Sequence, residues 1–387
     1  MTSNSVFFYS SEFLTYKFKK GHPFDQLRVL LTLDLLKKSS YINESHIKIP
    51  REATDDELLL AHSSEYIQSI RRASNNESAN DDVLLYGINT EDTPSFKNMD
   101  KASRVIVGAT LDAVDYVMTN IGSHAMNLGG GLHHAHRSKA SGFCIYNDIS
   151  IAIEYITRKY GLRVLYIDTD AHHGDGVQWN FYDRADVCTV SIHETGRYLY
   201  PGTGAVNERG KGTGYGYCFN VPLDAYTQDE SFLKTCKEVI SEVAEFFQPD
   251  IIITQNGVDA HHLDPLTHLS TSMKPFIELP YIAHELAHKY CNGRWVAVGG
   301  GGYDIWRVVP RAWSYIWTTM TDQGIPIGNL PESWINDWQP LTNSKLPSLW
   351  HEDEEVSFIA RKKDIEEKNE MTVQKCLQYI RNELKRQ

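Results

Sequence analysis

Residues 164–176 read VLYIDTDAHHGDG, and this stretch decides the fold. Val164 to Ile167 form a short apolar run that predicts a buried strand, and acidic residues, histidines and glycines follow it at once. Three other segments have the same design: AMNLGGGLHH at 125–134, IIITQNGVD at 251–259 and WVAVGGGGY at 295–303. Because open α/β sheets bind ligands at the carboxyl ends of their strands, we expect the four polar endings to share one rim.

Short β-rich runs alternate with longer helical patterns from about residue 120 to 320. This rhythm predicts the fold class as α/β, with a single open parallel β-sheet flanked by helices on both faces. The strands are expected at 6–9, 124–127, 164–167, 187–192, 251–254 and 295–298.

Helices are predicted where apolar residues recur at helical spacing, as they do through 106–117 and 233–247. Two Thr-x-x-Glu segments, at 54–57 and 227–230, have the pattern of a capping box, in which the Thr and Glu side chains satisfy backbone groups at a helix start. We therefore expect a helix after residue 54 and a second one that opens at 227–230.

The texture of the chain changes after residue 320. We expect a catalytic domain at 1–320 and a C-terminal loop and helical extension at 321–387, whose last part, from Glu352, is highly charged. One apolar stripe at helical spacing runs along this tail: Val373, Cys376, Ile380 and Leu384. The stripe predicts a helix that is packed on the body or used in self-association.

Composition and charge exclude several classes of protein. The 387 residues are 41% hydrophobic and 23% charged, with a formal net charge of −12, which is ordinary for a globular chain and disfavours a nucleic-acid partner. No apolar stretch approaches the roughly 20 residues that span a bilayer, so no membrane association is expected. The start, MTSNSVFFYS, lacks the pattern of a signal peptide, and the six scattered cysteines indicate reduced thiols, so we expect a cytoplasmic protein.

The polar endings contain a candidate metal site. Asp170 and His172 are two residues apart, so in an extended strand end their side chains point the same way, and Asp259 arrives from another strand. Three protein ligands with an open fourth position are typical of a catalytic metal site. Two oxygen donors and one nitrogen favour Zn²⁺, with Fe²⁺ as the alternative. The other interpretation is that Asp170 and His172 only hydrogen-bond the loop backbone.

Two histidines and a tyrosine supply the remaining chemistry of a hydrolase. His133 and His134 follow three glycines, and an imidazole is suited to take a proton from water beside a metal ion. A carboxylate that fixes each ring would assist, and Asp168 and Asp175 are available. Tyr303 ends the glycine strip, where its hydroxyl group could donate to an oxyanion.

One motif points to a different class. His284-Glu285-x-x-His288 matches the helical zinc motif of metalloproteases. Its helix precedes the strand at 295–298, so the motif is expected on the rim opposite the other site, and we interpret it as a chance match on an exposed crossover helix. The segment Gly210-Lys-Gly212 lacks the Ser or Thr of a phosphate-binding loop, and no G-x-S-x-G of a serine hydrolase occurs in the sequence.

Together the motifs resemble those of the metal-dependent histone deacetylase family. The segments that carry the resemblance are His22-Pro-Phe with Arg28, GGLHHAH at 130–136, SGFC at 141–144, DTDAHHGDGV at 168–177, YPGTG at 200–204, QNGVD at 255–259 and GGGGY at 299–303. They occur in the family's order over about residues 5–320. Within the family, the chain looks most like the bacterial acetoin-utilisation deacetylase branch, which implies an arginase/deacetylase-like fold.

The resemblance implies a role for each matched residue. Asp170, His172 and Asp259 match the zinc ligands, His134 the general base and acid, His133 its electrostatic neighbour and Tyr303 the oxyanion donor, with Asp168 and Asp175 beside the two histidines. The substrate-binding positions are Asp92 at the rim and Gly142, Phe143, Tyr200 and Leu266 along the tunnel. The family often has Phe where Tyr200 stands, so a more polar tunnel lip is expected. Two aromatic rings that face each other would form a tube for an alkyl chain, although core packing is the alternative for both rings.

Structural K⁺ sites are also typical of the family. Asp168, Asp170, His172, Ser191 and Ile192 match the inner site, and Phe181, Arg184, Val187 and Tyr217 match the outer one. Arg184 departs from the usual small polar residue, so its side chain is a doubtful ligand.

We therefore expect hydrolysis of acetyl-lysine on a protein, with an acyl-CoA synthetase as the substrate that the branch suggests. The alternatives are an acetylpolyamine amidohydrolase, a two-metal ureohydrolase of the arginase type, and a non-catalytic acyl-lysine binder. The presence of both His134 and Tyr303 disfavours the last. The sequence leaves the oligomeric state, the acyl-chain preference and the choice of metal ion open.

Overall fold

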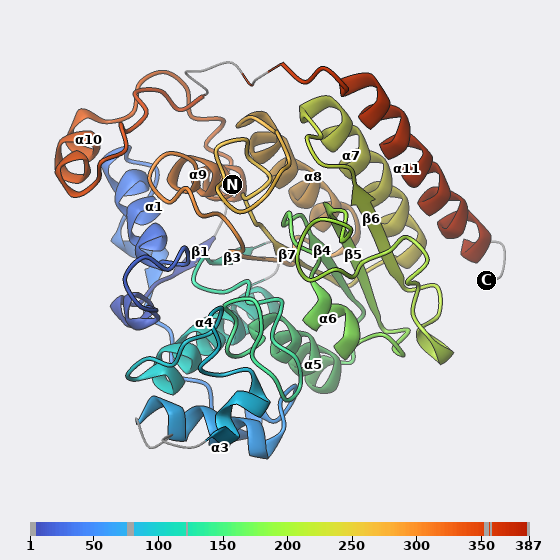
Figure 1. The fold of residues 1–387 in the computed structure, drawn as a ribbon, viewed down its shortest axis with the longest axis horizontal. Helices are drawn as coiled ribbons and strands as arrows, with labels where there is room; N and C mark the ends of the chain where they lie inside the picture. Colours follow the sequence, from blue (N-terminus) through green and yellow to red (C-terminus); the bar gives the residue numbers. More distant parts are fainter. Residues whose placement is uncertain (1–4, 76–80, 121–122, 352–355, 357, 385–387) are drawn as a thin grey trace.

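An eight-stranded parallel sheet lies at the centre of the molecule, in the order β2-β1-β3-β8-β7-β4-β5-β6 (Figure 1). The computed structural model describes residues 5–75, 81–120, 123–351, 356 and 358–384, so the start of the charged tail, 352–355, lies outside the described residues. The strands are β1 (Val6–Phe8), β2 (Ile47–Lys48), β3 (His124–Asn127), β4 (Val164–Asp168), β5 (Val187–Glu194), β6 (Cys218–Leu223), β7 (Ile251–Gln255) and β8 (Trp295–Val298). This confirms the predicted fold class.

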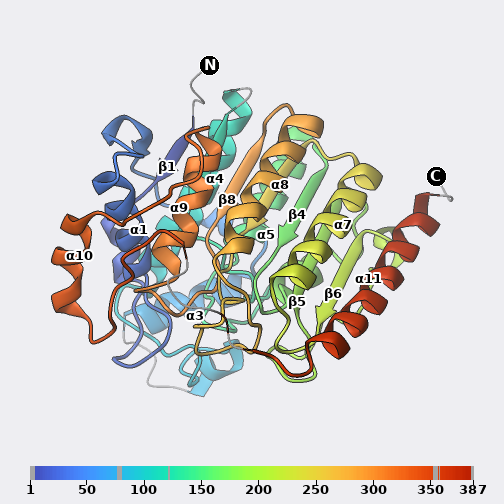
Figure 2. The ribbon, with the colours of Figure 1, turned by 90° about the horizontal axis from the view of Figure 1, so that it is seen from above.

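Helices cover both faces of the sheet, as Figures 1 and 2 show. One face carries a row of α1 (Leu27–Lys38), α9 (Val309–Met320), α8 (Lys274–Tyr290) and α7 (Asp229–Phe247). The other face carries α4 (Met99–Thr119) and α5 (Asp148–Tyr160), with α3 (Ser64–Ser74) outside α4. The shorter helices are α2 (Asp55–Leu58), α6 (Asp175–Asn180) and α10 (Glu332–Trp338). Among the described residues, none of the helices is long and apolar enough to cross a membrane.

The central strands form where the sequence predicts them. β3 and β8 have the predicted bounds, whereas β4, β5 and β7 each extend one or two residues further toward the polar endings. The prediction missed β6, whose Pro222 interrupts the usual strand pattern. β6 is an edge strand, the position in a sheet where proline is tolerated because one side of the backbone needs no partner.

One of the two predicted capping boxes is wrong. Thr54 and Glu57 form one at the start of α2. α7 begins instead at Asp229, and its N-cap residue makes no side-chain hydrogen bond. The Thr227 hydroxyl donates to the carbonyl of Asp224 at 2.6 Å and accepts from the Asn369 amide at 2.8 Å. A tertiary contact therefore takes the hydroxyl that local sequence assigned to the helix start.

The C-terminal helix α11 (Lys362–Leu384) packs against α7 and β6 at the edge of the sheet (Figure 2). Val373, Cys376 and Ile380 of the predicted stripe are buried there, while Leu384 is 42% exposed. Arg209 donates to Glu383 at 2.6 Å, so a nearly buried ion pair joins the end of α11 to the body. The tail is thus packed on the body, which is one of the two arrangements that the stripe predicts.

Candidate active site

The carboxyl ends of β4, β7, β3 and β8 meet at one rim and bring the predicted metal ligands together. Asp170 and His172 lie just after β4, in a bend rather than in the extended strand end that we expected. The His172 backbone N–H donates to Asp170 Oδ1 at 2.9 Å, so the turn itself brings the two side chains to the same side. Asp259 follows β7 by four residues.

The three side chains form a compact donor cluster. His172 Nδ1 lies 3.2 Å from Asp170 Oδ1 and 2.9 Å from Asp259 Oδ2. One ligand atom from each residue lies within 4.8 Å of the others. Asp170 is 1% exposed, His172 7% and Asp259 0%. The arrangement therefore goes beyond the hydrogen bonding of a loop backbone, which was the alternative interpretation.

Neighbouring groups hold both carboxylates in place. Asp170 Oδ2 accepts from the Gly301 backbone N–H and from the Gln255 amide, each at 2.6 Å. Asp259 Oδ1 accepts from the Ala171 N–H at 2.8 Å. A Cβ atom at Gly301 would lie 2.0 Å from Asp259 Oδ2, so only glycine lets the strip after β8 come this close.

The cluster has an excess of negative charge. Burial lowers the pKa of His172, but hydrogen bonds to Asp170 and Asp259 outweigh burial and raise it to about 10. Burial and the charge of Asp170 raise the pKa of Asp259 to about 6. Two buried carboxylates around one imidazole thus favour a positive charge, and a divalent cation with an open fourth position matches two oxygen donors and one nitrogen. The residues present therefore fit a catalytic Zn²⁺ or Fe²⁺ ion.

Each of the paired histidines contacts one carboxylate. His133 Nδ1 lies 2.8 Å from Asp168 Oδ2, and His134 Nδ1 lies 2.7 Å from Asp175 Oδ1. The two Nε2 atoms are 3.0 Å apart. These are the two pairs that the sequence predicts, and both are almost fully buried.

The two imidazoles differ in charge. Burial, and then the charge of His133, lower the pKa of His134 to about 4. Burial also lowers the pKa of His133, but the carboxylates of Asp168 and Asp170 outweigh burial and raise it to about 9. His134 is therefore neutral near pH 7 and able to accept a proton, whereas His133 carries a positive charge.

Tyr303 lies next to the donor cluster. Its ring centroid is 6.4 Å from that of His172 and 5.8 Å from that of Phe143. Burial, and then the charges of Asp259 and Asp170, raise the pKa of the phenol well above its usual value. The hydroxyl group therefore stays protonated and available as a hydrogen-bond donor.

Two residues without a predicted role, Arg28 and Asp264, fix the Tyr303 strip. Arg28 is buried under the rings of Phe24 and Trp313 and donates to the Gly302 carbonyl at 3.0 Å. Asp264 accepts from the Tyr303 backbone N–H at 2.8 Å, and burial and the charge of Asp259 raise its pKa to about 8. Arg28 stands in the N-terminal family motif, whereas no sequence motif points to Asp264, whose role depends on its hydrogen bond with the Tyr303 backbone.

The predicted tunnel residues lie around His134 and Tyr303. The ring centroid of Tyr200 is 5.1 Å from that of His134, and the Tyr200 hydroxyl bonds to Ser141. Gly142 has φ +50°, and a Cβ there would lie 2.4 Å from the His134 ring. Phe143 contacts Tyr303 and is held by Tyr16, whose hydroxyl donates to the Phe143 carbonyl at 2.6 Å. Tyr200 is 41% exposed, so core packing does not describe it, whereas Phe143 is partly buried and packs against the hydrophobic core.

The two remaining substrate-binding predictions lie further out. Asp92 is exposed. Burial raises the pKa of Tyr200, and the charge of the Asp92 carboxylate adds to this effect. Asp92 therefore lies near the Tyr200 side of the site. Leu266 is half-buried, and its backbone N–H donates to Asp264 at 2.9 Å. Asp264 therefore ties Leu266 to the Tyr303 strip.

The predicted K⁺ ligands are only partly brought together. Ser191, whose neighbour is Ile192, pairs with Asp168 across β4 and β5, next to the donor cluster. In the outer set, Arg184 pairs with Asp186 at 2.6 Å and with Glu154 at 3.1 Å, so its side chain is not a cation ligand. The carbonyls of two other members, Phe181 and Tyr217, accept backbone N–H groups, and Val187 begins β5. Both K⁺ sites stay predictions.

The H-E-x-x-H segment lies on the opposite rim, as expected. His284 and His288 are on α8, next to His124 at the start of β3. His124, His284 and His288 form the second group of potential metal ligands among the described residues. Burial, and then the charges of His284 and His288, lower the pKa of His124 to about 3. The sequence motifs did not indicate His124 as a metal ligand.

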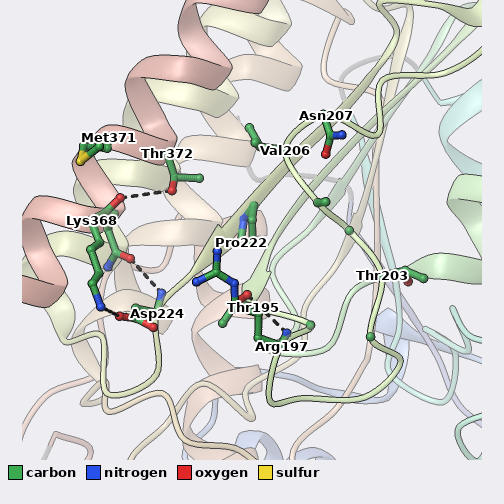
Figure 3. Close-up of a pocket in the computed structure, with 15 residues that line it drawn as sticks. Thr195, Arg197, Thr203, Val206, Asn207, Pro222, Asp224, Lys368, Met371 and Thr372 are labelled. Carbon is green, nitrogen blue, oxygen red and sulfur yellow. Dashed lines mark hydrogen bonds and ion pairs between the residues drawn. The ribbon is translucent and has the colours of Figure 1, made fainter.

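A hollow of about 550 Å³ lies between α11 and the loops on both sides of Tyr200 (Figure 3). Thr195 to Arg197 and Gly202 to Asn207 line it on one side. Lys368, Asn369, Met371 and Thr372 line it on the other, and Lys368 pairs with Asp224 at 2.9 Å. No residue of the donor cluster lines this hollow. The hollow shows that α11 borders the loop that carries Tyr200, a predicted tunnel residue.

Comparison with known proteins agrees with this geometry. Residues 22–320 match the model of the histone deacetylase domain. Acetoin utilization protein AcuC of Bacillus subtilis is 55% identical over 385 residues, which are 99% of both chains, and that of Staphylococcus xylosus is 46% identical over 381 residues, which are 98% of this chain and 99% of the relative.

Two crystal structures share the fold. An HDAC homologue from Aquifex aeolicus has 30% sequence identity and a TM-score of 0.83, and an HDAC homologue complexed with SAHA has 30% identity and a TM-score of 0.85. Each comparison covers 94% of this chain and 99% of the other. The chain therefore belongs to the histone deacetylase family, in the branch represented by the acetoin utilization proteins.

Proposed function

We propose that this deacetylase hydrolyses the amide bond of acetyl-lysine on proteins and releases acetate and free lysine. One observation carries the proposal: a neutral imidazole, His134, and a protonated phenol, Tyr303, both lie next to the buried donor cluster. A metal-dependent amide hydrolase can combine these three elements, namely a Lewis-acid position, a base and an oxyanion donor.

The donor cluster of Asp170, His172 and Asp259 would hold the metal ion, and we propose Zn²⁺. When bound there, a divalent ion polarises the amide carbonyl and acidifies a water molecule. All other steps belong to side chains of the chain. His134 takes the proton of the water. Asp175 Oδ1 lies 2.7 Å from His134 Nδ1 and so fixes the orientation of the ring.

Tyr303 then donates a hydrogen bond to the negative charge that develops on the carbonyl oxygen. The oxygen of the deprotonated water bonds to the carbonyl carbon, and the C–N bond then breaks as His134 returns its proton to the amine nitrogen, so that acetate and free lysine leave. His133 keeps a positive charge next to His134 and Asp170, and so offsets the negative charge of the cluster during these transfers.

The surroundings of the cluster support a protein substrate. Phe143 and Tyr200 contact Tyr303 and His134, where they would enclose the apolar part of a lysine side chain. Asp92 is an exposed carboxylate on the Tyr200 side, and it would accept N–H groups of the peptide that carries this lysine. An acyl-CoA synthetase is the protein substrate that we propose to test first.

A substrate panel tests the proposal. Zinc-loaded protein is incubated with acetyl-lysine peptides, an acetylated acyl-CoA synthetase, acetylated polyamines and arginine, and the release of acetate or urea is measured. We expect the highest kcat/KM for acetyl-lysine on a peptide or protein. A higher value for acetylated polyamines, or urea from arginine, would contradict the proposed substrate.

An Asp92→Asn variant refines the same panel. We expect a higher KM for peptides and an unchanged rate on free acetyl-lysine, because only a peptide offers backbone N–H groups to Asp92. An equal effect on both substrates would show that Asp92 does not recognise a peptide.

A further inference from the structure

Three imidazole rings meet at the amino-terminal rim of the sheet, at the opposite end of the strands from the active site. His124 is the first residue of β3, and His284 and His288 are one turn apart on α8. His288 Nε2 lies 3.3 Å from His124 Nε2 and 3.1 Å from His284 Nε2. The ring centroids are 4.8, 5.1 and 4.5 Å apart. The same type of nitrogen thus points inward from all three rings.

Hydrogen bonding alone does not explain this convergence. A neutral imidazole has one N–H and one lone pair, so His288 Nε2 cannot serve both neighbours at once. His124 is 1% exposed, and burial disfavours a protonated ring. His288 Nε2 must therefore share one N–H or one lone pair between two neighbours, whereas a cation between the rings would take a lone pair from each of the three nitrogens.

The distances match those of a metal site. Two nitrogen ligands at 2.0–2.1 Å from a tetrahedral Zn²⁺ ion lie about 3.3 Å apart. The contacts of His288 with its two neighbours, 3.3 and 3.1 Å, are close to this separation. The spacing of His284 and His288, four residues on one helix, is also the one by which helical zinc sites bring two histidines to one face.

The surroundings favour a bound cation as well. Trp295 is fully buried beside His124 and His284, with centroid distances of 5.5 and 6.3 Å, and it forms a fixed apolar wall. Burial and the nearby His288 lower the pKa of His284. The carboxylates of Asp322 and Glu285 oppose this shift, so negative charge lies near the cluster. His288 is exposed, which gives an ion a path of entry from solvent.

We propose that His124, His284 and His288 bind a second metal ion, a divalent transition metal that prefers imidazole ligands, with Zn²⁺ as the probe. Three neutral nitrogen donors suit Zn²⁺, Cu²⁺ and Ni²⁺ better than Mg²⁺ or Ca²⁺, which prefer oxygen. The ion would join β3 to α8, two elements far apart in the sequence. Glu285 is exposed, and we assign the site to metal binding, separate from the hydrolytic centre.

Metal counting on the full-length protein tests the proposal. The protein is stripped with a chelator, titrated with Zn²⁺ by calorimetry and analysed for bound zinc after dialysis. We expect two equivalents for the wild type, one for Asp259→Asn, one for His288→Gln and none for the double variant. Tyr281→Phe, an exposed change on the same helix that leaves the three imidazoles and the nearby carboxylates in place, is the matched control and should keep two equivalents. His288→Gln is preferred to a change at buried His124 because a substitution at an exposed position changes the stability of the fold little.

The outcomes separate this proposal from the proposed function, because no substrate is present. A wild type that binds one equivalent, or a His288→Gln variant that still binds two, would overturn the second site. Cu²⁺ added to Asp259→Asn provides an independent readout. We expect nitrogen hyperfine coupling from several imidazoles in its electron paramagnetic resonance spectrum and loss of that coupling on adding His288→Gln. A spectrum that His288→Gln leaves unchanged would also overturn the assignment.

Discussion

The two rims of the sheet offer two clusters of potential metal ligands with different surroundings. The carboxyl-terminal rim has two carboxylates and one imidazole, all buried, with His134 and Tyr303 beside them. The amino-terminal rim has three imidazoles whose burial falls from His124 to exposed His288. The comparison teaches that donors alone do not define a hydrolytic centre. The proposed base, His134, and the proposed oxyanion donor, Tyr303, lie next to the first cluster, and they are the reason that we propose catalysis there.

Replacement of the proposed base, His134, should lower the activity of the carboxyl-terminal rim more than any other change. We expect His134→Ala to lower kcat on an acetyl-lysine peptide by about 10²–10⁴-fold, because a positioned general base contributes that much. The zinc content should stay at the wild-type value, since His134 is not one of the three donors. Steady-state kinetics and metal analysis of the same sample check both expectations. An unchanged kcat would exclude His134 as the base.

Removal of the phenol has the next largest effect. Tyr303→Phe keeps the ring near Phe143 and His172 but deletes the hydroxyl group. We expect kcat to fall by about 10²–10³-fold, the usual cost of one oxyanion donor, at unchanged metal content. Rates of acetate release at saturating peptide measure this change. If the variant were fully active, the oxyanion role of Tyr303 would have to be abandoned.

Metal binding at the amino-terminal rim should raise the free energy of unfolding of the protein. In the Asp259→Asn background, Zn²⁺ at about 100 times its dissociation constant should raise the free energy of unfolding by about 2.7 kcal/mol, because it binds the folded state only. Urea unfolding with and without Zn²⁺ measures the gain. Adding His288→Gln should abolish the gain, and a gain that persists in the double variant would place the stabilising ion elsewhere.

A change at Gln255, next to the metal donors, should have the smallest of these effects. It tests how far a neighbouring hydrogen bond tunes the zinc affinity of the carboxyl-terminal rim. Gln255→Met removes the amide that donates to Asp170 Oδ2 at 2.6 Å but keeps a similar volume. We expect zinc affinity at the carboxyl-terminal rim to fall by about 10–100-fold, as is typical when a hydrogen bond to a ligand is lost. Competition with a chelator in the His288→Gln background isolates this site. An equal affinity in both proteins would mean that Gln255 does not tune the ligand.

The carboxyl-terminal rim could be predicted from sequence because its residues follow strand ends in short motifs. VLYI before DTDAHHGD and WVAV before GGGGY place the donors, the histidines and Tyr303 at the same rim as soon as the strands are recognised. Even there, the bend that brings Asp170 and His172 together, and the anchoring of the Tyr303 strip by Asp264, depend on tertiary hydrogen bonds. Local sequence does not contain those contacts.

The amino-terminal rim shows where prediction from sequence ends. His284 and His288 share a recognisable motif, but His124 lies at the start of a strand far away in the chain. The packing of α8 against the sheet brings it to them. Thr227 failed as a helix cap for the same reason, because its hydroxyl is used by Asn369 of α11. In both cases a long-range contact decided the role of a residue.

The most direct test of the account is acetate release from an acetyl-lysine peptide as Zn²⁺ is returned to stripped protein. The wild type should regain activity in proportion to the ion bound by Asp170, His172 and Asp259, and Asp259→Asn should stay inactive although it still binds zinc at the amino-terminal rim. Activity in Asp259→Asn that rises with added zinc toward the wild-type rate would contradict the account.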